Sequence, residues 1–90
     1  MTDWPEYESY KIVRAARIVR VEERESASGS RRVNAIWIQP EEGAPEEVFE
    51  PTDPAMMDRA WAGGWAVLYP DGFKSVSPRL AFEQGYRRKS

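Results

Sequence analysis

Apolar and polar residues alternate most clearly in the last third of the chain. Residues 65–69 place large side chains at every second position, which is typical of a β-strand with one buried face. The Tyr-Pro-Asp-Gly sequence at 69–72 has the chemistry of a type I turn, and residues 73–76 predict a returning strand. A Ser-Pro step at 77–78 then predicts the start of a short helix that Gly85 ends.

The pattern of residues 10–39 predicts a hairpin. Residues 10–23 are rich in β-branched side chains, which favour a strand, but basic residues at every third position disturb the period of two. A bulge near Ala15-Ala16 would restore one buried face, because an extra residue reverses the facing of the positions that follow. Residues 32–39 alternate as a second strand, and the Ser- and Gly-containing residues 24–31 predict the loop between the two.

The middle of the chain predicts a short extended piece and a helix. Residues 48–50 are extended and stop at a proline. Asp53 and Pro54 are typical of a helix N-cap and first helical position. Met57 and Trp61 are four positions apart and would share one face of an α-helix, so we expect both to pack in the core.

Together these elements predict one α+β domain over residues 1–90. We expect a small, mainly antiparallel sheet of four to five strands, curled or forming a partial barrel, with two short helices. Residues 1–9 and 87–90 show no clear periodicity and are expected to be irregular ends.

The composition changes the picture mainly by what it lacks. The chain has no cysteine and no histidine. It therefore has no thiol nucleophile, no thiolate metal site and no imidazole base, which together serve a large share of active sites. We expect a protein that is not an enzyme and that holds no metal or cofactor.

Hydropathy gives an expectation for location. No apolar run approaches the roughly 20 residues that span a bilayer. The first residues are acidic, whereas a signal peptide begins with basic residues and an apolar stretch. We therefore expect no membrane association and a cytoplasmic protein, in the host cell if the chain is encoded by a phage.

The net charge is only −2, but the charges are separated along the chain. The acidic loop at residues 40–47 is expected to bind a protein partner and to steer its association. The residues of this prediction are Glu41, Glu42, Glu46 and Glu47.

An alternative is a nucleic-acid-binding domain that uses the basic strand 11–20 and the basic tail 87–89. Its phosphate-binding residues would be Arg14, Arg17, Arg20, Arg87, Arg88 and Lys89, with Trp37 or Tyr10 for base stacking. The acidic sequence pI of about 5.2 argues against a dedicated nucleic-acid binder. The arginines are equally able to pair with the acidic loop, and a homo-oligomer remains open.

Residues 64–86 resemble the C-terminal part of small accessory proteins of unknown function that are encoded by phages and prophages. The shared positions are Gly64-Trp65, Asp71-Gly72-Phe73, Ser77-Pro78, Phe82-Glu83 and Tyr86. The resemblance implies a phage or prophage origin and no activity. It suggests an inhibitor of a host defence complex, or alternatively a minor structural or assembly component of the phage.

Overall fold

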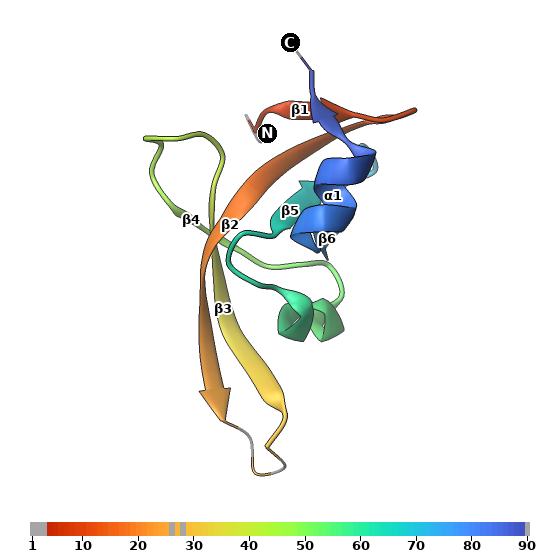
Figure 1. Ribbon diagram of the computed structural model, residues 1–90. Coiled ribbons are helices and arrows are strands. Elements are labelled where there is room, and N and C mark those ends of the chain that lie inside the picture. Colours follow the sequence, from red (N-terminus) through yellow and green to blue (C-terminus); the bar gives the residue numbers. More distant parts are fainter. Residues whose placement is uncertain (1–3, 26, 28, 90) are drawn as a thin grey trace.

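The computed structural model describes residues 4–25, 27 and 29–89 (Figure 1). These described residues form seven strands, a 3₁₀-helix and an α-helix. The strands are β1 (Glu6–Glu8), β2 (Ile12–Glu25), β3 (Arg31–Gln39), β4 (Glu47–Phe49), β5 (Trp65–Leu68), β6 (Lys74–Ser77) and β7 (Arg87–Arg88). The helices are η1 (Pro54–Arg59) and α1 (Arg79–Gly85).

The predicted α+β class, with a mainly antiparallel sheet and two short helices, is confirmed. The strand pairs of the described residues are all antiparallel, in the order β4-β3-β2-β1-β7, with β5 on β2 and β6 on β5. The sheet is open and is no closed barrel. It has more strands than the four to five expected, because short strands form at both ends of the chain.

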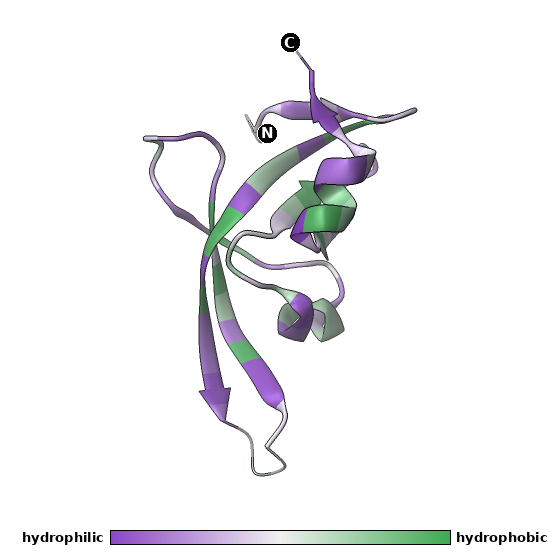
Figure 2. Cartoon of the chain, in the orientation of Figure 1, coloured by the Kyte–Doolittle hydropathy of each residue, from purple (hydrophilic) through white to green (hydrophobic). Residues whose placement is uncertain are grey.

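Strand β2 is the central strand of the sheet, because β1, β3 and β5 all pair with it. Its residues 12–14 pair with β1, residues 14–17 with β5 and residues 17–25 with β3. Beyond the residues of β3 that pair with β4, β2 and β3 continue as a two-stranded ribbon whose far end is hydrophilic (Figures 1 and 2). Charged side chains at Glu22–Glu25 are exposed along this end, which discourages pairing with other chains.

The bulge in β2 lies later than we predicted. Ala15 and Ala16 sit in a regular ladder opposite Val67 and Ala66, and the register shifts instead between Ile18 and Arg20. The alternation of residues 12–18 is therefore continuous, and the extra residue changes the facing only after Ile18.

The sheet has a core on each face. On one face, α1 places Phe82 against Trp65, with ring centroids 4.7 Å apart, and Val13 and Val67 complete that cluster. On the other face, the aliphatic side chains of β2 and β3 pack with Phe49, Trp4 and Ala60. The alternation of β5 supports both cores, since Trp65 and Val67 face one and Ala66 the other.

The helix after Asp53 is a 3₁₀-helix, and this makes our expectation for Trp61 wrong. Asp53 is the N-cap as predicted, with its carboxylate accepting the N–H of Ala55 at 3.0 Å. A 3₁₀-helix has three residues per turn, so Met57 shares a face with Ala60 rather than with a residue four positions on. Ala60 is buried and Met57 packs on the core, whereas Trp61 is 58% exposed.

The ends of the chain are not irregular throughout, contrary to the prediction. β1 and β7 pair with each other, with Tyr7 opposite Arg88 and Glu8 opposite Arg87. The ring of Tyr7 packs edge-on against Trp65 and Phe82, which anchors β1 beside α1. These contacts join residues about 80 positions apart, as the pair Tyr7 and Arg88 shows, so a local pattern could not predict them.

The C-terminal motif largely follows its prediction. The 69–72 turn forms with Gly72 N–H donating to Tyr69 at 2.9 Å and with Gly72 in the left-handed region. Asp71 accepts the N–H of Phe73 at 2.9 Å, which holds the turn. The predicted Ser77 cap is wrong: Ser77 ends β6, and Pro78 occupies the N-cap position without a side-chain hydrogen bond.

Candidate functional site

The acidic loop is held in shape by its own backbone and by β3. Ala44 N–H donates to the carbonyl of Glu41 at 3.0 Å, and Gly43 takes a positive φ that reverses the chain. From the end of β3, the Gln39 amide donates to the carbonyl of Ala44 at 2.8 Å. The loop therefore presents its carboxylates from a defined turn beside β4.

Two of the four predicted acidic residues pair with residues of the predicted basic set. Glu41 forms an ion pair with Arg88 of β7. Glu46 pairs with Arg20 of β2 at 3.4 Å, and the guanidinium of Arg20 lies 3.8 Å from the ring centroid of Trp37. The hydrogen bond to Glu41 raises the pKa of Arg88 above its ordinary value. These contacts tie the loop to two strands that are distant in sequence.

Glu42 and Glu47 have no ion pair in the described part of the chain. Glu47 is the first residue of the edge strand β4, and Glu42 lies in the loop before it. The central residue of β4, Val48, is 63% exposed and lies opposite Trp37. We call Glu42, Glu47 and Val48 the acidic edge. Pro45 and Pro51 bracket β4, which limits its extension as a strand, so the acidic edge is suited to side-chain contacts.

Arg17 is occupied by contacts on the α1 side of the sheet. Its guanidinium lies 5.2 Å from the ring centroid of Trp65 and 3.6 Å from the carboxylate of Glu83. The indole N–H of Trp65 donates to Glu83 at 3.1 Å. This hydrogen bond, with help from Arg79, lowers the pKa of Glu83 and keeps it ionised beside Arg17.

Arg14 and Lys89 meet at a different carboxylate. Arg14 lies 3.7 Å and Lys89 4.0 Å from Glu6 of β1. Arg14 also donates to the backbone carbonyl of Trp4 at 2.5 Å, on the sheet face opposite Arg17. Of the six basic residues predicted, only Arg87 lacks an ion pair among the described residues.

The structure therefore divides the basic set instead of joining it into one surface. Arg14 and Arg17 lie on opposite faces of β2, because they are three positions apart in a regular strand. Arg20 returns to the face of Arg17 only because the bulge intervenes. A phosphate backbone tracking β2 would meet these guanidiniums on two faces, each already beside a carboxylate.

A pocket of about 390 Å³ lies where the acidic and basic sets meet. Burial raises the pKa of the Tyr7 phenol in its wall above the ordinary value. Two guanidinium groups and two carboxylates line it, so their formal charges cancel and the pocket does not select an anion. Its lining residues are Tyr7, Arg17, Gln39, Pro40, Glu41, Glu42, Trp65 and Arg88.

No group of three or more acidic residues in the described ranges could hold a metal ion. The carboxylates of Glu41 and Glu46, which the sequence places close together, face guanidinium groups on different strands. Their arrangement supports ion pairing and charge steering.

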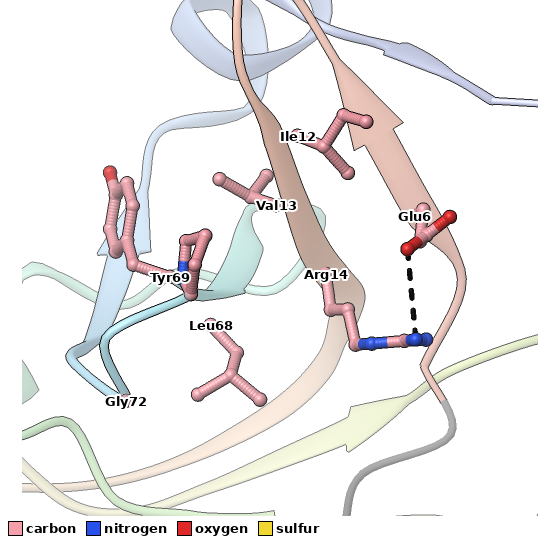
Figure 3. Close-up of a pocket in the computed structure, with 8 residues that line it drawn as sticks. Glu6, Ile12, Val13, Arg14, Leu68, Tyr69 and Gly72 are labelled. Atoms are coloured by element: carbon pink, nitrogen blue, oxygen red, sulfur yellow. Dashed lines mark ion pairs between the residues drawn. The ribbon is translucent and has the colours of Figure 1, made fainter.

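A second surface feature was missed from the sequence. A pocket of about 520 Å³ opens between the start of β2 and the 69–72 turn, with Val13, Leu68 and Tyr69 around it and the Glu6–Arg14 ion pair at its rim (Figure 3). Ile12 in its wall is 38% exposed, and Tyr10, two positions earlier in the chain, is 93% exposed. The signal in the sequence was the Tyr-Lys-Ile run at 10–12, which we assigned wholly to a strand.

Comparison with known proteins adds no assignment. The chain matches no protein-family profile, no curated protein and no solved structure. Within the described residues, no helix is both long and apolar enough to cross a membrane.

Proposed function

We propose that this protein is a non-enzymatic protein-binding module and that it binds its partner through the acidic edge. One observation carries the proposal: Glu42 and Glu47 form no ion pair in the described chain, whereas five of the six predicted basic residues do. Unpaired carboxylates attract cationic groups of a partner and accelerate its association.

The apolar side chains at the acidic edge support the same function. Val48 is largely exposed, and the neighbouring Trp37 is covered on one side by the guanidinium of Arg20. Tryptophan and arginine are enriched among the residues that dominate protein–protein binding energies. Glu47 and Val48 are adjacent in β4 and point to opposite faces, so a complementary partner would wrap this edge, with an apolar side chain against Val48 and a basic group toward Glu47.

Nucleic-acid binding through the basic set is the weaker proposal. A phosphate would have to displace Glu83 from Arg17, Glu46 from Arg20 and Glu41 from Arg88. Each displacement exposes a carboxylate beside the incoming phosphate, and like charges repel.

The resemblance of residues 64–86 to phage-encoded accessory proteins suggests one form of this function. In that form, the acidic edge would cover a basic surface on a host defence complex and so inhibit it. A component of phage assembly is the alternative form, and it would place the same surface against another phage protein.

Affinity capture from a nuclease-treated lysate tests the proposal when matched variants are run in parallel. The triple variant Glu42→Gln, Glu47→Gln, Val48→Ser should lose a protein that the wild type retains. The control Glu8→Gln, Glu25→Gln also removes two carboxylates that form no ion pair in the described residues, but away from β4, and should retain it. Equal capture by all three proteins, or a protein that is captured from untreated lysate but lost after nuclease treatment, would overturn the proposal.

A further inference from the structure

The pairing between β2 and β5 stops one hydrogen-bonded residue pair short of Ile12, the first residue of β2. The last pair is Arg14 with Leu68, so the next rung on that edge would join Ile12 to Pro70. Pro70 has no N–H to donate, and the chain turns away there, with Tyr69 N–H donating to Phe73 at 2.9 Å. In the described chain, no backbone hydrogen bond joins Ile12 to this turn.

The backbone of Ile12 faces the apolar pocket of Figure 3. In β2 the even-numbered residues bond toward β5: Ile18 N–H donates to Gly64 at 2.9 Å, and the carbonyl of Ile18 accepts from Gly63 at 2.8 Å. The odd-numbered Ala15 bonds the other way, to Pro5 at 3.1 Å. This alternation directs the N–H and C=O of Ile12 toward the β5 side, where a pair with Pro70 is missing. We call this missing pair the open rung.

The surroundings of the open rung are apolar. The pocket is lined by the apolar residues Ile12, Val13 and Leu68, and the ion pair between Glu6 and Arg14 leaves its rim without net charge. On the far side of Tyr69 and Pro70 lies a second depression of about 630 Å³, which includes Phe73.

We propose that this pocket binds an extended segment of a partner protein, which pairs its backbone with Ile12 and inserts an uncharged apolar side chain beside Ile12 and Leu68. Strand addition combines main-chain hydrogen bonds with pockets for alternate side chains. The site is separate from the acidic edge and does not rest on the function proposed for it.

The folded chain itself offers no suitable segment, which favours a different protein over a second copy. Among the described strands, β4 lies between two prolines and β7 has two residues. The edge of β6 is partly occupied, since Thr52 N–H donates to Lys74 at 2.8 Å. The free edge at the C-terminal end of β2 carries the charged residues Glu22–Glu25, and burying a charge in an apolar pocket is unfavourable.

Selection from a yeast-displayed library of random peptides tests the proposal on the full chain. Recovered peptides should share an apolar position and bind Ile12→Glu roughly tenfold or more weakly, because the charge occupies the pocket wall. They should bind Leu80→Ser unchanged, since that residue is a 67% exposed apolar side chain on α1, outside the residues that line this pocket.

Amide hydrogen exchange distinguishes backbone pairing from simple apolar contact. The synthetic form of a selected peptide should slow exchange at Ile12 and leave Tyr10 unaffected. Recovery of no peptide, or of peptides that bind Ile12→Glu as well as the wild type, would overturn the proposal. Unchanged exchange at Ile12, or concentration-dependent dimers that Ile12→Glu abolishes, would also overturn it.

Discussion

Arg88 in the last strand forms an ion pair with Glu41 in the acidic loop, 47 positions earlier in the chain. The sequence assigns the acidic loop to protein binding and the basic tail to nucleic-acid binding. The ion pair joins these two segments and neutralises one charge of each. The pair joins β7 to the loop after β3 and leaves Glu42 beside it without an ion pair in the described residues.

Removing this pair should loosen the loop without unfolding the protein. Both side chains are 55% exposed, and ion pairs of this kind contribute little to global stability. We expect Arg88→Gln to speed amide exchange at Ala44, whose N–H donates to Glu41, while the urea midpoint stays nearly constant. Glu41→Gln should have the same effect, and the double variant should add nothing. Unchanged exchange at Ala44 would show that Gln39 alone holds the loop.

Replacement of two glycines by alanine should change stability in opposite directions. A Cβ at Gly64 would meet the backbone oxygens of Ser77 and Trp61 at 3.0 and 3.1 Å, so Gly64→Ala should destabilise by about 1–3 kcal/mol. A Cβ at Gly85 meets nothing within 4 Å, and this helical position should gain about 0.5–1 kcal/mol. Urea unfolding measures both, and equal effects would contradict the close approach at Gly64.

Local chemistry made much of this fold predictable. Alternation gave the positions of the main hairpin and of β5, and the Tyr-Pro-Asp-Gly turn formed with Gly72 in the left-handed region as expected. Trp61 was assigned to the core because we assumed an α-helix. The segment forms a 3₁₀-helix instead, which changes the face on which each residue lies.

The candidate site was less predictable, because pairing between distant segments creates it. The face on which Arg20 lies depends on the bulge after Ile18, which the sequence does not mark. The partners of Arg17 and Arg20 come from α1 and the acidic loop, and only the packed sheet brings them together. The open rung at Ile12 depends likewise on the register between β2 and β5.

Arg31 should be the most important arginine for stability. It is largely buried and donates to the backbone carbonyl of Asp58 at 2.6 Å and to that of Ala60, under the ring of Trp61 at 3.6 Å. Arg31→Met should reduce the free energy of unfolding by about 2–3 kcal/mol, because hydrogen bonds from a charged group are lost at a partly buried site. Arg24→Met, at an exposed position of the same ribbon, should change it little. Similar losses in both variants would contradict this role.

Asp58 should make stability sensitive to acid. The backbone N–H of Val33 donates to it at 2.8 Å and lowers its pKa, with a further contribution from Arg32. A carboxylate with a lowered folded-state pKa stabilises the fold above its unfolded pKa of about 3.9, and this is lost as the pH falls through the folded value. Asp58→Asn should therefore be less stable than the wild type at neutral pH, and the difference should shrink below about pH 4. Urea unfolding across this range checks it, with Glu42→Gln as a control that lacks the hydrogen bond. A difference that persists undiminished in acid would contradict the assignment.

The association rate of the captured partner tests the central claim most directly. If the acidic edge steers a basic protein surface, the rate should fall with added salt and fall again in Glu42→Gln, Glu47→Gln, while Glu8→Gln, Glu25→Gln associates like the wild type. A rate that neither salt nor the acidic-edge variant changes would contradict the account. Tight binding of an oligonucleotide that Arg17→Gln, Arg20→Gln abolishes would contradict it as well.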